Sequence, residues 1–239
     1  MRIDKLLSHM GYGTRKEVKA LLKSGNVRVN ESSVNSPKIH VDPERDQVTV
    51  YGEMVEYREF IYLMMNKPDG LVSATEDAVE ETVIEILQPE DLIFEPFPVG
   101  RLDKDTEGLL LITNDGQLAH RLTSPKKDVG KTYFAVIDGE VTDADIEKFN
   151  KGVTLDDGYV TKSGQLQILV TGAVSEIELT ITEGKYHQVK RMFEAVGKRV
   201  TYLKRISMGT LKLDEDLAPG EYRELSDEEV AYLKELTNM

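Results

Sequence analysis

Cysteine is absent from the 239-residue chain, and proline occurs only eight times. Without cysteine, a disulfide, a thiolate zinc site and a cysteine nucleophile are all impossible. Long apolar runs are also missing, because stretches such as residues 109–112 are far shorter than the ~20 residues of a membrane-spanning helix. The N-terminus lacks the uninterrupted apolar core of a secretory signal. With 40% hydrophobic and 31% charged residues, the composition predicts a globular, cytoplasmic protein that does not bind membranes.

Acidic residues outnumber basic ones, and the net charge of −13 taken alone argues against a nucleic-acid partner. The two signs are segregated along the chain, however. Residues 1–30 contain seven lysines and arginines but only two acidic residues. A second basic run over residues 185–205 contains seven cations and the single acid Glu194. Two separate basic regions in an acidic chain predict binding to one extended polyanion.

The first 30 residues predict two short amphipathic helices. Apolar residues at positions 3, 6, 7 and 10 have helical spacing, and the glycines at 11 and 13 end this first helix. Thr14 and Glu17 then stand at the spacing of a capping box, which begins a second helix. Its polar side carries four cations, Arg15, Lys16, Lys19 and Lys23. These cations either face a phosphate backbone or form an ordinary solvated helix surface.

Alternating residues at 26–30 and 47–50 predict strands, so two helices and a small sheet occupy residues 1–52. This pattern resembles the S4 RNA-binding domain in its opening Arg-Ile-Asp-Lys-Leu-Leu, in the helix start at 14–16 and in the corner at 24–30. We therefore expect an S4-like module with its linker over residues 1–58. The resemblance implies that it binds structured RNA through Arg2, Lys5, Arg15, Lys16, Lys19 and Lys23.

Residues 59–239 form the second predicted domain, in which strand-like and helix-like segments alternate. We expect strands at 61–65, 71–74, 108–113, 131–137, 165–170, 175–182 and 200–206. We expect helices at 82–87, 117–122 and 142–150, and a closing helix capped by Ser226. Several of the strands follow one another directly, which favours antiparallel pairing. The predicted fold class is α+β, with a mixed, mainly antiparallel sheet and flanking helices.

The segment Gly-Arg-Leu-Asp at residues 100–103 lies in a polar loop between two apolar stretches. Arg101 and Asp103 are two residues apart, so in an extended loop their side chains point to the same side. A carboxylate beside a guanidinium stays ionised. From spacing alone, this pattern is better explained by an ordinary turn with a surface ion pair.

A second polar segment, residues 183–197, predicts a helix with a core stripe at 189, 192, 193 and 196. Arg191 lies on another side of this helix and can reach inward, or it can belong to a solvated basic face. His187 lacks further ligands at metal-site spacing and has no nucleophile paired with it in the sequence. We therefore expect neither a metal site nor a catalytic histidine.

Together these segments closely resemble the RsuA family of pseudouridine synthases, which modify ribosomal RNA. The resemblance covers nearly the whole chain and includes Asn-Lys-Pro-Asp-Gly at 66–70, Lys-Thr-Tyr at 131–133 and Leu-Ala-Pro-Gly-Glu-Tyr at 217–222. It implies that Asp103 is the catalytic residue. It also implies an active cleft that runs across a largely antiparallel sheet.

The resemblance further implies the chemistry, in which the N1–C1′ bond of a uridine breaks and the base rejoins the ribose through C5. Such an isomerisation needs no cofactor and no metal, and the sequence contains no nucleotide-binding signature. By motif position, Arg191 resembles the basic partner of the aspartate, and Tyr133 the tyrosine that packs on the target base. Arg101 is expected to assist in holding the nucleotide, with Lys185 and Lys190 contributing to RNA binding.

The segment Lys-Tyr-His-Gln-Val-Lys-Arg-Met-Phe at residues 185–193 resembles the corresponding segment of the small-subunit type of this family. We therefore expect a monomeric enzyme that acts on 16S rRNA or on a small-subunit assembly intermediate. Two alternatives stay open from the sequence. One is a synthase for 23S rRNA, and the other is an RNA-binding or ribosome-assembly protein without catalytic activity.

Overall fold

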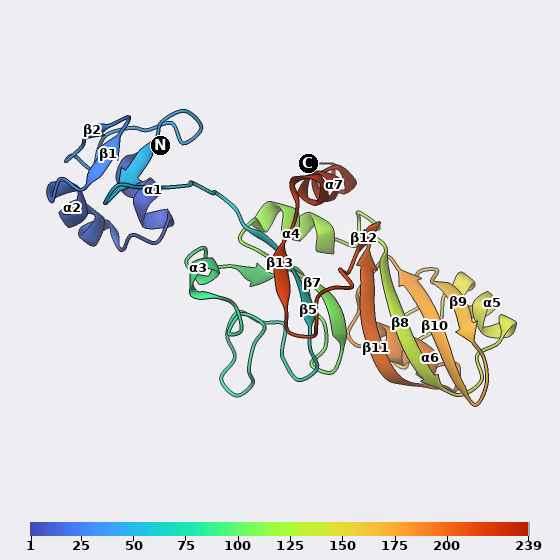
Figure 1. Cartoon of the computed structure of the whole chain (residues 1–239). Helices are drawn as coiled ribbons and strands as arrows, with labels where there is room; N and C mark the ends of the chain where they lie inside the picture. The colour runs from blue at the N-terminus through green and yellow to red at the C-terminus, as the bar shows by residue number, and fades with distance from the viewer. Residues whose placement is uncertain (239) are drawn as a thin grey trace. The chain divides into compact units, whose positions relative to one another are not determined.

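The structure of the protein, a computed structural model, describes residues 1–238. It divides the chain into two units, the first made of residues 1–61 with 87–95 and the second of residues 62–86 with the chain from 96 onward. The predicted division after residue 58 therefore differs in that residues 59–61 and 87–95 join the first unit. Figure 1 shows the elements of each unit. Among the described residues, no helix has the length and apolar character needed to cross a membrane.

The first unit contains three helices and a small antiparallel sheet. Helix α1 (Ile3–His9) and helix α2 (Arg15–Lys23) agree closely with the predicted pair, and Thr14 and Glu17 form the capping box of α2. The sheet has the order β2-β1-β3-β4. Its strands are β1 (Val27–Val29), β2 (Ser32–Ser33), β3 (Val48–Val50) and β4 (Glu53–Met54). The segment 87–95 contributes the short helix α3 (Pro89–Leu92). Side chains of α1, α2, β1 and β3 form one buried core.

The second unit is built on one sheet in the order β13-β5-β7-β11-β8-β10-β9, with β12 beside β11 and β6 beside β7. Its strands are β5 (Tyr62–Lys67), β6 (Phe97–Pro98), β7 (Glu107–Thr113), β8 (Lys131–Asp138), β9 (Gln165–Val170), β10 (Val174–Ile181), β11 (Arg199–Met208), β12 (Leu211–Lys212) and β13 (Tyr222–Glu224). All pairs in this sheet are antiparallel except β7 with β11, which confirms the predicted mixed, mainly antiparallel sheet.

Helices cover the sheet at several places. They are α4 (Gly116–Thr123), α5 (Asp143–Lys151), α6 (Gln188–Glu194) and α7 (Asp227–Leu236). Helices α4 and α7 contact each other and share a core with apolar side chains of β5 and β7. Helix α5 packs on β9 and α6 on β11, where the rings of Phe149 and Phe193 lie 4.9 Å apart. The site described below lies near the central strands, with Tyr133 on β8 and Asp103 on the loop that leads into β7.

The segment 71–87 departs from the prediction of a strand followed by a helix. Residues 71–74 contribute only an isolated bridge between Val72 and Thr82, and residues 83–86 form turns. Val72 accepts a hydrogen bond from the Val83 amide and donates its own amide to Glu81. Because these backbone groups bond across the loop, they do not form helical i to i−4 bonds. The predicted helix at 82–87 is therefore wrong.

Candidate active site

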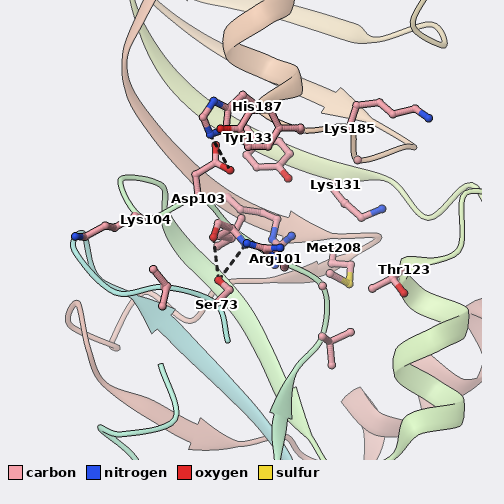
Figure 2. A pocket seen from close by; sticks show the side chains of 17 residues that line it. Ser73, Arg101, Asp103, Lys104, Thr123, Lys131, Tyr133, Lys185, His187 and Met208 are labelled. Atoms are coloured by element: carbon pink, nitrogen blue, oxygen red, sulfur yellow. Dashed lines mark hydrogen bonds and ion pairs between the residues drawn. The ribbon is translucent and has the colours of Figure 1, made fainter. Parts of the chain in front are cut away.

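Asp103 lies on the loop that joins β6 to β7, and hydrogen bonds hold this loop on the side of Ser73. The Leu102 amide donates to Ser73 Oγ at 3.1 Å, and Ser73 Oγ donates to the Leu102 carbonyl at 2.9 Å. The Thr106 amide donates to the Asp103 carbonyl at 3.0 Å, which closes a turn around the aspartate. Figure 2 shows Ser73 bonded beneath the loop, with the Asp103 carboxylate on its opposite side. These bonds fix the backbone directly before and after Asp103.

Lys67, at the end of β5, braces the same loop from inside the unit. Its side chain is fully buried, and Nζ donates to the carbonyls of Pro68, Lys104 and Thr106 at 2.9 to 3.0 Å. Burial lowers the pKa of Lys67 to about 8, against the opposing effect of nearby carboxylates, Asp69 first among them. In the sequence, Lys67 stands out only as part of the Asn-Lys-Pro motif. Nothing in its spacing indicates that it holds the aspartate loop.

Lys190, and not Arg191, is the basic partner of Asp103. Lys190 Nζ lies 3.4 Å from Asp103 Oδ2. Consecutive helix residues point about 100° apart, so Arg191 faces another direction, where its guanidinium pairs with Asp156 and Asp157. The predicted pairing of Arg191 with Asp103 is therefore wrong. Lys190, which was predicted only to bind RNA, takes that place.

The surroundings of Asp103 keep a positive charge beside it. Lys190 also donates to Asp105 Oδ1 at 2.6 Å. Burial disfavours the charged form of Lys190, but this hydrogen bond and the two nearby carboxylates outweigh burial and raise its pKa. His187 Nε2 lies 3.7 Å from Asp103 Oδ1, and its left-handed backbone, with φ of 48°, places the ring there. This position of His187 beside Asp103 was not predicted from the sequence.

Asp103 borders a cleft of about 570 Å³ in the second unit. Tyr133, on β8, is 8% exposed and contributes its ring to the cleft. Figure 2 shows Tyr133 between Asp103 and Lys131 in this view. Arg101, predicted to hold the nucleotide, is exposed and also lines the cleft. The structure thus brings the predicted residues Arg101, Asp103 and Tyr133 to one cavity.

Exposed groups stand around this cleft. Lys104 and Lys185 are exposed, and Lys185 Nζ lies 4.4 Å from the centre of the Tyr159 ring. Tyr186 is 75% exposed and stacks on His187, with ring centres 3.8 Å apart and an interplanar angle of 18°. A cation and an exposed aromatic face side by side are the groups that contact the phosphates and bases of single-stranded RNA.

The cations predicted to bind RNA in the first unit are exposed. Within the described residues, no ion pair neutralises five of them, Lys5, Arg15, Lys16, Lys19 and Lys23. Arg2 differs, because its guanidinium makes two hydrogen bonds to the buried Asp4. We therefore infer that the first role of Arg2 is to stabilise α1 and that RNA binding is its second role. In residues 1–238, no group of three His, Asp or Glu side chains is arranged to hold a metal ion.

Comparison with known proteins identifies the family. Residues 61–195 match the RNA pseudouridylate synthase family, and residues 1–48 match the S4 domain. The chain belongs to the RNA pseudouridylate synthase family. The synthase is 58% identical to a Bacillus subtilis (strain 168) protein described as an uncharacterized RNA pseudouridine synthase, YtzG, over 98% of this chain and 99% of the relative. It is 39% identical to ribosomal small subunit pseudouridine synthase A of Escherichia coli (strain K12), over 97% and 99%.

A solved structure shows that the fold of this synthase is shared. A crystal structure of a pseudouridylate synthase superposes with a TM-score of 0.68 at 35% identity, and the match covers 98% of this chain and 99% of that one. The predicted family, the S4-like start and the α+β fold are therefore confirmed.

Proposed function

We propose that this pseudouridine synthase converts one uridine of 16S rRNA to pseudouridine, with Asp103 as its catalytic carboxylate. Relatives named ribosomal small subunit pseudouridine synthase A are 39% to 43% identical to it over 97% of the chain. The observation that carries the role of Asp103 is its position. The carboxylate stands on a braced loop, beside the Lys190 ammonium and at the edge of a cleft that contains the Tyr133 ring.

In this proposal Asp103 acts on the ribose of the target uridine. Its carboxylate either attacks C1′ or removes a ribose proton, and both routes require an ionised group beside the sugar. Lys190 supplies a positive charge at one carboxylate oxygen, and His187 lies at the other. The N1–C1′ bond breaks, the base turns, and a C5–C1′ bond forms. C5 loses its proton and N1 gains one, so the product is an isomer of the substrate.

Tyr133 and the cations around the cleft position the nucleotide. A uridine must leave the RNA stack to reach Asp103, and the ring of Tyr133 offers a face on which its base packs. Arg101 and Lys104, both exposed beside Asp103, then contact the phosphates on either side of the target uridine. The free cations of α2 contact more distant phosphates of the folded RNA.

The experiment is carbodiimide labelling followed by primer extension across 16S and 23S transcripts and across small-subunit particles. We expect one new stop in 16S rRNA with the parent protein and none with Asp103→Asn. The control variant Asp143→Asn removes an equal charge from the exposed first turn of α5 and keeps the stop. A stop in 23S rRNA would keep the chemistry and overturn the proposed substrate. No stop in any RNA or particle would favour an RNA-binding protein without activity.

A further inference from the structure

Two basic side chains stand together at the inner wall of the cleft, beside Tyr133. Lys131 precedes Tyr133 by two residues on β8, so both side chains point to the same face of the sheet. Arg205, on β11, lies directly opposite Tyr133 in the antiparallel register, and opposed residues share a face. All three residues line the cleft. The fold therefore places one cation on the same strand as the tyrosine and another across from it.

Both cations are deeply buried and neither is paired with an acid. Arg205 is 2% exposed and Lys131 is 8% exposed. Arg205 Nε donates to the Leu109 carbonyl at 2.7 Å, but Nη2 has no hydrogen-bond partner. Lys131 Nζ donates to the Val129 carbonyl at 3.1 Å. Across residues 1–238, neither of the two forms an ion pair.

Such an arrangement opposes folding, so we infer that it serves another purpose. Burying a charge without an opposite charge is unfavourable, and an unsatisfied buried donor adds to the cost. Burial, and then the charge of Arg205, lower the pKa of Lys131 to about 8. Two buried cations facing one cavity are suited to a ligand that is negatively charged or that presents carbonyl oxygens.

The depth of these cations decides which part of an RNA reaches them. A phosphodiester continues into the chain on both sides, so it stays near the exposed cations Arg101, Lys104 and Lys185 at the edge of the cleft. The base of an extruded nucleotide is attached at one point only and can enter further. A uracil that packs on Tyr133 therefore directs its carbonyl edge toward side chains that flank this tyrosine.

We propose that Lys131 and Arg205 bind the carbonyl oxygens of the target uracil and stabilise the negative charge of the base while it is detached. This inference rests on the proposed function. When the N1–C1′ bond breaks, its electron pair leaves with the base, and the charge spreads from N1 to O2 and O4. The two cations donate hydrogen bonds to these oxygens and transfer no proton. Preorganised donors aimed at developing charge act most strongly where water is excluded.

The test compares full-length protein and Lys131→Met in single-turnover reactions on whichever RNA or particle the parent modifies. We expect the variant to slow conversion about 10²-fold, the usual effect of removing one such donor. RNA affinity should stay close to that of the parent, because phosphates supply most of it. Lys131→Arg should recover part of the rate because it keeps the charge. Lys148→Met, at an exposed position of α5, is the matched control.

A second substrate separates charge stabilisation from a structural role. In RNA that carries 5-fluorouridine, fluorine withdraws electrons and stabilises the detached base by itself. The slowing caused by Lys131→Met should then shrink by about tenfold when consumption of the fluorinated nucleoside is followed by mass spectrometry. Equal slowing on both substrates would overturn the proposal, and so would loss of RNA affinity without loss of rate. If the parent protein converts no uridine, the proposed function fails first, which is a distinguishable result.

Discussion

Lys190 Nζ lies 3.4 Å from Asp103 Oδ2, and this contact joins α6 to the loop before β7. The lysine is largely buried, with 19% of its side chain exposed, so solvent screens the contact less than it screens a surface pair. The carboxylate is thereby held at the cleft by a group from a different part of the chain. Removing that group leaves the Asp103 carboxylate without its lysine partner.

The first prediction concerns this pair. We expect Lys190→Met to lower kcat by about 10²-fold, because small misplacements of a catalytic group have effects of that size. Lys190→Arg should retain more activity, since it keeps the charge. Arg191→Met is the matched control from the next position, because its guanidinium pairs with Asp156 and Asp157 and not with Asp103. Steady-state kinetics measure all three variants. An Arg191→Met enzyme as impaired as Lys190→Met would contradict the assignment.

The second prediction separates activity from folding at Asp103. The side chain is 28% exposed and does not belong to the buried residues of the core. We therefore expect Asp103→Ala to abolish conversion while changing the free energy of unfolding by less than about 1 kcal/mol. Urea denaturation and the conversion assay, run on the same preparation, measure both. A strongly destabilised variant would show that the loop needs this carboxylate to fold.

The sequence predicted much of the fold because its local signals agree with the tertiary structure. The capping box at Thr14 and Glu17 begins α2, and the alternation from residue 131 gives β8 with one buried face. The helix expected at 82–87 failed because its backbone bonds across a loop to Val72, a contact that no local pattern reveals.

The candidate site was predictable only in part, and for a related reason. Asp103, Arg101 and Tyr133 stand in recognisable motifs, so the resemblance to a family located them. Whether Lys190 or Arg191 faces Asp103 depends on how α6 is rotated about its axis. Neighbouring residues of a helix point about 100° apart, so an offset of one residue changes which side chain faces the aspartate. Lys67 and Arg205 act through burial and long-range contacts, which the sequence does not display.

The third prediction concerns the exposed cations of α2. We expect the triple replacement of Lys16, Lys19 and Lys23 by glutamine to weaken rRNA binding and to flatten its dependence on salt. Each lost phosphate contact reduces the steepness of the plot of log K against log salt concentration by roughly 0.7 to 0.9. Filter binding at several salt concentrations measures the slope. Glutamine at Lys148 and Lys151, on α5, should change neither quantity, and an unaltered slope in the triple variant would refute the RNA-binding role of α2.

The fourth prediction uses the lowered pKa of Lys131. Folding lowers this pKa from 10.5 to about 8, so the folded protein binds the proton less tightly than the unfolded chain does. The parent therefore carries the full penalty below pH 8 and gains stability as the pH rises from about 8 to 10.5. Lys131→Met lacks the penalty, so we expect it to be more stable than the parent at pH 7, by at most about 3 kcal/mol.

The advantage of Lys131→Met should decline between pH 8 and 10.5. Other groups titrate in this range, such as Lys67, whose pKa burial lowers to about 8. They are common to both proteins and cancel in the difference. Denaturation of parent and variant at each pH gives that difference directly. A variant that is less stable than the parent at pH 7 would show that Lys131 serves the fold and not the ligand.

The fifth prediction concerns Gly108, which lies beside Arg205 in the parallel pairing of β7 and β11. Gly108 has a φ of 99°, and a Cβ added to it would lie 2.2 Å from the Arg205 carbonyl oxygen. Gly108→Ala therefore strains the backbone and separates the two central strands, so we expect a loss of about 3 kcal/mol or more. Gly116→Ala is the control, because an added Cβ meets nothing within 4 Å at the start of α4. Thermal denaturation compares the two variants. Equal stability of the two variants would mean that β7 and β11 separate without a loss of stability. The position of Arg205 would then not depend on this glycine.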